Sequence, residues 1–313
     1  MISDFSAAIA APKILRFDDI DAFRSSVRHL DVDFTPLAAR ISAEQIILNL
    51  RGCDVNYTKS FPRIIDVQLA PGSTAVGFSM DDGVPIRFNG IERDRSAIVI
   101  GSGGAAYNAV ERTPRQYASI VFTPEIEDRG WPRTDLGFKI FETSQTAQNL
   151  LRKLVMQVLS VSSELAQTSE AAGVSVAIRE SLLAAIDNAF AVVTANWATR
   201  ANSAGQFKIF RDIQAALSGD VARPIYSREL ARQVGVSVRT MHDAVQRYRG
   251  MSLHRYLRLR RLWLVRQRLL AGAPSVKACA LAGGFWHLSD FSRSYRSQFG
   301  ESPSETLARG RQG

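Results

Sequence analysis

Polar side chains recur at helical spacing in two short segments near the C-terminal end of the chain. Arginine makes the commonest specific contact to guanine, a bidentate hydrogen bond, and a carboxylate accepts from the amino group of cytosine. This pattern favours hydrogen bonding to the base edges and phosphates of duplex DNA. The candidate contact residues are Ser237, Arg239, Thr240, His242, Asp243, Gln246 and Arg247 in the first segment, Arg258 between the segments, and His287, Ser289, Asp290, Ser292, Arg293 and Arg296 in the second.

Each segment requires a helix that presents it, and the sequence around each predicts a helix-turn-helix. In the first unit, Tyr226 and Ser227 open a short helix with the small residue Ala231 on its inner face. Gly235 to Ser237 then form a turn, and the Ser237 hydroxyl caps the recognition helix over residues 237–249.

The second unit repeats this plan. Ser275 caps a helix over residues 276–282, Gly283 and Gly284 supply a left-handed turn, and Phe285 packs beneath a recognition helix over 288–298. The apolar residues of both recognition helices recur at three-to-four spacing, which predicts core positions. These residues are Met241, Ala244, Val245, Phe291, Tyr295 and Phe299.

A third helix, over residues 254–270, is expected to join the two units. It would place an apolar face inward (Leu257, Leu262, Val265, Leu269, Leu270) and its arginines mostly off that face (Arg258, Arg261, Arg266, Arg268). About 17 residues of helix rise roughly 25 Å. That length suits two recognition helices in successive major grooves, which recur about every 34 Å.

Residues 207–307 resemble the AraC/XylS family of transcription regulators. The segment GFWHLSDFSRSYRSQFGESPS (284–304) is similar to the family's run of Gly-Phe, Phe-Ser-Arg, an aromatic, Phe-Gly and Ser-Pro. In the first unit, SVRTMHDAVQRYRGMS (237–252) keeps the Ser start and the Gly-Met-Ser exit. It departs from the family at Val245, where an aromatic is usual, and at Asp243, where arginine is frequent.

The resemblance implies a cytoplasmic transcription regulator, with an activator responsive to a small-molecule effector as the leading hypothesis. It also implies a cupin-like β domain that binds the effector, helices that form a dimer seam, and RNA polymerase as a partner. A constitutive DNA-binding regulator without an effector is the first alternative. An enzyme fused to a DNA-binding module, such as a repair methyl acceptor with a reactive Cys53, is the second.

Charge is divided unevenly between the two parts of the chain. Residues 206–313 hold 19 Lys and Arg against 7 Asp and Glu, a balance of +12, whereas residues 1–205 hold 20 against 23, a balance of −3. The whole positive excess therefore lies in the segment with the two units, as phosphate neutralisation requires.

The predicted fold is α+β with two domains. Residues 1–143 form a β-rich sensory domain, 144–204 a helical hairpin for dimerisation, and 205–313 the DNA-binding domain, with a boundary at 201–205. Short apolar runs between turn residues predict strands at 64–69, 75–80, 86–89, 97–100 and 117–122, typical of a sandwich or small barrel. Leucine and isoleucine at helical spacing predict the hairpin helices at 144–166 and 175–198.

Other chemistry lacks the residues it needs. The four histidines are too scattered for a metal site, and no cofactor or catalytic residue is expected. The glycines at 101–104 fit a strand-connecting turn, since no Lys-Ser/Thr follows them. Cys53 and Cys279 are too few for a disulfide framework, and no apolar run approaches 18 residues, so we expect no membrane span. The start of the chain does not resemble a signal peptide.

Overall fold

The computed structural model describes residues 11–82, 85–93, 97–126, 129–131, 138–165, 171–193, 195–196, 201–219 and 226–312. The chain divides into two compact units. Unit 1 comprises Met1–Phe34, Ile41–Ile86 and Glu92–Ala198, and unit 2 comprises Thr35–Arg40, Arg87–Ile91 and Thr199–Gly313.

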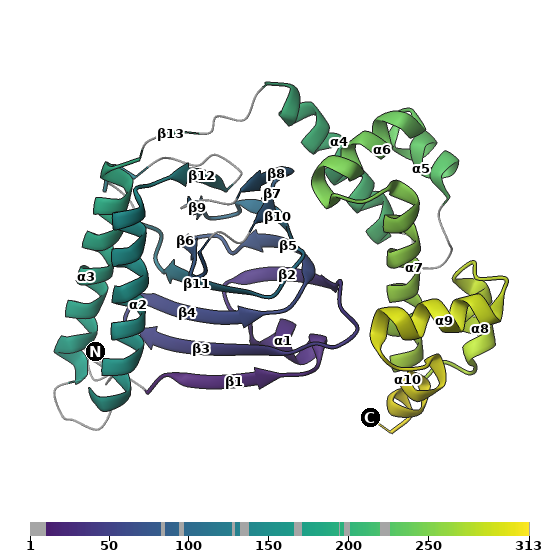
Figure 1. Cartoon of the computed structure of the whole chain (residues 1–313), viewed down its shortest axis with the longest axis horizontal. Helices are drawn as coiled ribbons and strands as arrows, with labels where there is room; N and C mark the ends of the chain where they lie inside the picture. The colour runs from purple at the N-terminus through teal and green to yellow at the C-terminus, as the bar shows by residue number, and fades with distance from the viewer. Residues whose placement is uncertain are drawn as a thin grey trace, which may run out of the picture. The chain divides into compact units, whose positions relative to one another are not determined.

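The strands of the first 198 residues form two antiparallel sheets (Figure 1). The larger sheet has the order β1-β3-β4-β11-β6-β9-β12-β13, and the smaller one has the order β2-β5-β10-β7-β8. The strands are β1 (Lys13–Phe17), β2 (Leu30–Pro36), β3 (Ala43–Leu50), β4 (Cys53–Ser60), β5 (Arg63–Leu69), β6 (Thr74–Ser79), β7 (Ile86–Phe88), β8 (Ile91–Arg93), β9 (Ala97–Ser102), β10 (Ala106–Glu111), β11 (Arg115–Phe122), β12 (Lys139–Glu142) and β13 (Ala195–Asn196).

Three helices accompany these sheets, namely α1 (Ile20–Ser26), α2 (Gln145–Leu165) and α3 (Ala171–Ala191). The Asp19 carboxylate begins α1 by accepting from the backbone N–H groups of Asp21 and Ala22, at 2.9 and 3.0 Å. The hairpin α2–α3 packs on the larger sheet (Figure 1).

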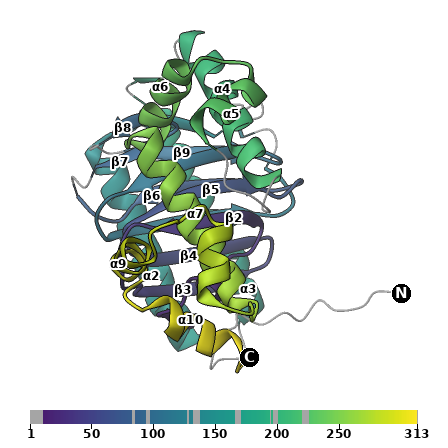
Figure 2. The same ribbon diagram turned by 90° about the vertical axis from the view of Figure 1, so that its right-hand side faces the viewer.

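Unit 2 contains seven described helices. They are α4 (Ala201–Gly219), α5 (Ser227–Val234), α6 (Val238–Arg249), α7 (Leu253–Leu270), α8 (Val276–Ala282), α9 (Leu288–Phe299) and α10 (Pro303–Gly310). Within this unit, α7 runs from the group formed by α4, α5 and α6 to the group formed by α8, α9 and α10 (Figure 2).

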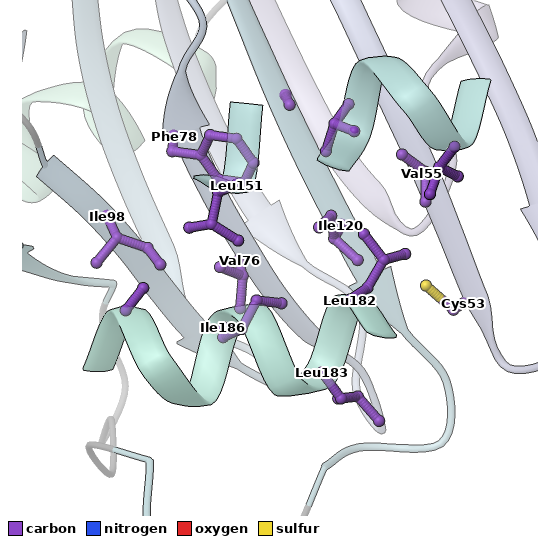
Figure 3. Packing of buried hydrophobic residues seen from close by; sticks show 14 of the residues in the cluster. Cys53, Val55, Val76, Phe78, Ile98, Ile120, Leu151, Leu182, Leu183 and Ile186 are labelled. Carbon is purple, nitrogen blue, oxygen red and sulfur yellow. The ribbon is translucent and has the colours of Figure 1, made fainter. Parts of the chain in front are cut away.

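The apolar core of unit 1 lies between the larger sheet and the hairpin. Period-two alternation places Val55, Val76 and Ile120 on one sheet face, and Leu182 and Ile186 of α3 point toward it (Figure 3). All five side chains are completely buried. Cys53 belongs to the same cluster, so it is a core residue of strand β4.

The interior between the two sheets is partly polar. Arg63 on β5 is 1% exposed, and its Nε donates to Glu111 on β10 at 3.1 Å. Its guanidinium also donates to the Tyr117 hydroxyl at 3.2 Å and stacks on the Phe34 ring at 4.5 Å. A buried charge is stable only when it is paired in this way.

Several predicted boundaries differ from the structure. The expected domain boundary at 201–205 lies inside α4, whereas the two compact units divide between Ala198 and Thr199. Strand β13 falls within the segment expected to be only a hairpin, where it pairs with β12. Helix α3 begins at Ala171, before the predicted start at 175. Helix α3 ends at Ala191, so the predicted extension of this helix to 198 is wrong, and β13 lies within that stretch. The predicted end of the first hairpin helix, at 166, lies outside the described residues.

Candidate nucleic-acid interface

The first helix-turn-helix is built from α5 and α6. Helix α5 ends at Gly235, whose φ of 74° is the left-handed conformation that glycine adopts without strain. The Val236 N–H closes the turn by donating to the Ala231 carbonyl at 3.0 Å. Ser237 then caps α6, since its hydroxyl accepts from the Thr240 N–H at 3.0 Å, as the sequence predicts.

The second helix-turn-helix is built from α8 and α9. The Ser275 hydroxyl caps α8 by accepting from the Ala278 N–H at 3.1 Å. The Phe285 N–H closes the turn on the Ala280 carbonyl at 2.9 Å, so it matches Val236 of the first unit. Only Gly284 is left-handed, with φ of 75°, which corrects the prediction of a left-handed pair, because Gly283 has φ of −81°.

The two recognition helices share one register. Each has 12 residues, each ends at a left-handed glycine (Gly250 or Gly300), and each is followed by a serine cap (Ser252 or Ser302). A residue of α6 therefore matches the residue of α9 with a number higher by 50. The matched pairs are Arg239 with Ser289, Thr240 with Asp290, His242 with Ser292, Asp243 with Arg293 and Gln246 with Arg296.

Most candidate contact residues are exposed. In the first unit these are Ser237, Arg239, His242, Asp243 and Gln246, and in the second they are His287, Ser289, Asp290, Ser292, Arg293 and Arg296; Arg258 of α7 is exposed as well. The opposite faces of both helices are core, as predicted, because Met241, Ala244, Val245, Phe291 and Tyr295 are at most 1% exposed.

Two candidate DNA-contact residues of the first helix-turn-helix already have hydrogen-bond partners within unit 2. Arg247 is half-buried and donates to the Gln206 side chain on α4 at 3.1 Å. Thr240 is half-buried, and its hydroxyl lies 2.8 Å from that of Ser237. Their side chains therefore support the shape of the first unit in addition to any contact they make with a ligand.

Each recognition helix carries one weak, exposed contact between an acidic and a basic side chain. Asp290 and Arg293 are 3.5 Å apart on successive turns of α9, and His242 lies 3.7 Å from Asp243 on α6. All four side chains are about half exposed or more, so solvent screens these pairs and they contribute little to stability. Arg293 is accordingly available for a stronger anionic or base partner.

The arginines of helix α7 contact both helix-turn-helix motifs. Arg258 donates to the Ser294 hydroxyl on α9. Arg261 stacks on Phe285 of the second unit at 5.1 Å and lies 5.9 Å from the ring of Tyr226 at the start of α5. Burial lowers the pKa of Arg261 from its usual range.

The prediction that the arginines of α7 lie mostly off the apolar face is wrong for Arg266. This residue is 7% exposed, stacks on Phe299 at 4.9 Å and pairs with Glu301. Of the residues predicted for the apolar face, Leu257, Leu262, Val265 and Leu269 are buried, and Leu270 is half-buried. Glu301 supplies the negative charge that makes the buried arginine favourable.

Helix α4 packs on α5 and α6 of the first helix-turn-helix, and it was not predicted from the sequence. Phe210 of α4 stacks on Tyr248 of α6 at 4.9 Å, and Arg249 lies over the same Phe210 ring at 4.5 Å. The spacing of Phe207, Phe210, Ile213 and Leu217 is the helical signal that could have identified it.

Within the described part of the chain, no group of three or more His, Cys, Asp or Glu residues could hold a metal ion. No helix in the same residues is long and apolar enough to cross a membrane.

Comparisons with known proteins match the region around these units. The family described as "Helix-turn-helix domain" matches residues 230–309. The XylDLEGF operon transcriptional activator 1 of Pseudomonas putida is 34% identical over 103 residues, 32% of this chain and 31% of the relative. The probable thc operon regulatory protein of Rhodococcus erythropolis is 35% identical over 94 residues, 29% of this chain and 28% of the relative.

Among solved structures, a probable AraC family transcriptional regulator from Rhodopseudomonas palustris CGA009 aligns with 38% identity and a TM-score of 0.30. This alignment covers 33% of this chain and 97% of that chain. The chain spans less than a third of the length of the two curated relatives described above. Residues 230–309 therefore form a helix-turn-helix domain whose sequence is similar to the corresponding part of these transcription regulators.

Proposed function

We propose that this protein binds specific duplex DNA and regulates transcription of operons, as an activator that responds to a small-molecule effector. The observation that carries this proposal is the pair of helix-turn-helix units in one register. Each presents exposed polar side chains on one helix face, and their segment holds the whole basic excess.

The test is a selection from a pool of randomised duplexes with the full chain, followed by titration of the enriched duplex and a scrambled duplex. We expect one asymmetric enriched site that binds at least about a thousandfold more tightly than the scrambled one at the same salt. Equal affinities for both duplexes would contradict sequence-specific binding.

The effector is proposed to bind unit 1. Arg63 and Glu111 form a buried ion pair between the sheets, with their side chains 3.1 Å apart. Four aromatic side chains of this part of the chain pack against different neighbours. Phe78 and Trp131 belong to the core beneath the hairpin, whereas Tyr107 packs on Phe138 and Phe88 lies on β7 of the smaller sheet.

A thermal-shift screen of small metabolites separates a responsive regulator from a constitutive one. A compound that binds unit 1 at a hundred times its Kd should stabilise the fold by about 2.7 kcal/mol, seen as a rise in Tm. A responsive regulator should also change its operator affinity or its transcription with that compound. A hit without either change favours the constitutive alternative.

A homodimer is proposed, with the hairpin as the seam. Leu150, Met156 and Val161 of α2 and Val176 of α3 are each about half exposed, an apolar surface that a second copy would cover. Sedimentation of the wild type and a Met156→Glu variant tests this, since a monomeric wild type would exclude it. RNA polymerase is the other proposed partner, with the cytoplasm as the site of action.

The methyl-acceptor alternative is disfavoured by Cys53. The residue is 3% exposed, and burial raises the pKa of its thiol to about 12. The thiolate required for methyl transfer is therefore scarce at neutral pH. Iodoacetamide labelling of the folded chain checks this, and rapid modification of Cys53 at pH 7 would restore the alternative.

A further inference from the structure

Between the residue whose N–H closes the turn and the recognition helix, the second helix-turn-helix has one residue more than the first. In the first unit a single residue, Ser237, separates Val236, whose N–H closes the turn, from the recognition helix. In the second unit two residues, Trp286 and His287, separate the equivalent Phe285 from α9. The longer turn therefore places an additional side chain immediately before the recognition helix.

Trp286 in that turn is 70% exposed, an unusual state for a tryptophan. Among the described side chains of residues 205–217 and 226–312, the exposed large apolar residues are Tyr226, Val238, Trp286 and Leu288. Each of the four lies either at the start of a helix of one helix-turn-helix or in the turn between its two helices. Val238 and Leu288 are the first residues of the two recognition helices, so the exposed apolar surface follows the proposed DNA-binding elements.

The exposed charges of the same helix-turn-helix indicate which partner would cover Trp286. Arg293 and Arg296 of α9 and Arg258 of α7 are exposed, and Asp290 is the acidic residue of α9. Exposed arginines on α9 and α7, together with an exposed apolar side chain in the turn before α9, suit a polyanion that offers apolar groups. The major groove of DNA is such a surface, because the C5 methyl of thymine projects into it beside the phosphates.

We propose that Trp286, with Leu288 beside it, packs on thymine C5 methyl groups in the major groove next to the bases that α9 reads. This inference rests on the proposed sequence-specific DNA binding. It makes Trp286 a specificity-determining residue, and it gives the second unit a preference for thymine that the hydrogen-bonding residues of α9 do not provide.

The test uses the full chain and the duplex enriched from the randomised pool. Each thymine of the enriched site is replaced in turn by 2′-deoxyuridine, which removes the methyl group and keeps the base pair. For the wild type we expect about a fourfold loss of affinity at one or two thymines of the half-site bound by the second unit, the loss expected for one buried methyl group. Trp286→Ala should bind the normal site more weakly and lose this sensitivity, whereas Trp286→Phe should retain part of it.

The position of the indole is measured separately by fluorescence. The difference in emission between the wild type and Trp286→Phe reports on this side chain, and we expect it to change when the enriched duplex is added. If deoxyuridine weakens the wild type and Trp286→Ala equally, or if the difference emission is unchanged, the thymine contact is wrong while DNA binding stands. If no duplex is enriched at all, the proposed function and this contact fail together.

Discussion

At the scale of single residues, the two recognition helices carry different side chains at positions that match in their shared register. Asp243 in α6 occupies the position that Arg293 holds in α9, and both side chains are exposed. One position therefore carries opposite charges in the two units. Since the backbone geometry is shared, this contrast must change what each unit binds.

Arg293→Ala should cost about 1 to 3 kcal/mol of binding free energy at one base position, because a bidentate contact to guanine is lost there. The measurement is a titration against the operator and its single-base variants. Arg258→Gln is the comparison, since Arg258 lies on α7 and should weaken all sequences alike. An unchanged sequence preference in Arg293→Ala would make Arg293 a phosphate contact only.

Asp243→Asn and Asp243→Arg should tighten binding to random DNA and narrow the margin by which the operator is preferred. The carboxylate repels phosphates, yet it can accept from the amino group of cytosine. The measurement is a pair of titrations, operator and scrambled duplex, at one salt concentration. Unchanged affinity for both duplexes would mean that Asp243 points away from DNA.

At the scale of elements, the local signals of the helix-turn-helix were sufficient to predict it. Serine caps, left-handed glycines and three-to-four apolar spacing act within a few residues, so Ser237, Ser275 and Gly235 could be placed without tertiary information. The buried Arg266 could not, because its partner Glu301 lies 35 residues away and is brought close only by the fold.

Substitutions at two adjacent glycines test what stabilises the turn between α8 and α9. Gly284→Ala should destabilise the fold by about 1 to 2 kcal/mol because Gly284 is left-handed. Gly283→Ala should destabilise it for a different reason, since its Cβ would lie 2.6 Å from Cγ2 of the buried Val265. Chemical denaturation measures both changes.

Val265→Ala distinguishes the two causes. It should partly relieve Gly283→Ala in the double variant and leave the cost of Gly284→Ala unchanged. Equal coupling of Val265→Ala to both glycine variants would show that the close contact with α7 is not the source of the Gly283 effect.

The cluster around Glu301 should make the stability of the second helix-turn-helix sensitive to acid. Burial raises the pKa of Glu301, but hydrogen bonds from Arg266 and Thr306 outweigh it, so the pKa lies below its usual value. A carboxyl with a lowered pKa stabilises the fold above its unfolded pKa of about 4.3, and this stability is lost as pH falls through the folded value. Wild-type stability should therefore fall more steeply below about pH 4 than that of Glu301→Gln.

Thermal melts of both proteins between about pH 3 and 7 provide the measurement. Glu305→Gln is the matched control, because Glu305 also has a lowered pKa, but this comes from hydrogen bonds to Ser302 at an exposed helix start. Parallel pH profiles for the wild type and Glu301→Gln would contradict the role of the buried cluster.

At the scale of the whole molecule, length and charge predicted two domains, but the pairing of strands could not be predicted from local sequence patterns. The five expected strand segments correspond to β5, β6, β7, β9 and β11, each bounded by turn residues. Strand β3 was not predicted, since both of its faces are largely buried and its sequence AEQIILNL lacks a clean alternation. Strand β13 pairs with β12 across the hairpin, a connection that no local pattern reveals.

The C-terminal segment of unit 2, from residue 199 onward, should fold and bind DNA alone if its helices supply both recognition elements and their support. A fragment of residues 199–313 contains α4 through α10 and carries the basic excess. Its affinity for the operator should fall steeply with salt, as counterion release requires. Affinity that does not depend on salt, or no binding at any salt, would contradict the assignment of this unit as the DNA-binding part.

A shorter fragment of residues 226–313 tests the role of α4 directly. It keeps both recognition helices but loses Phe210, which stacks on Tyr248 and lies beneath the Arg249 guanidinium. Removing this ring exposes the buried side of α6, so the first unit should lose its order while the second keeps its own core of Phe285, Phe291 and Tyr295. We therefore expect the shorter fragment to protect only one half-site in footprinting, and the longer fragment to protect both. Protection of both half-sites by the shorter fragment would show that α5, α6 and α7 hold the first unit together without α4.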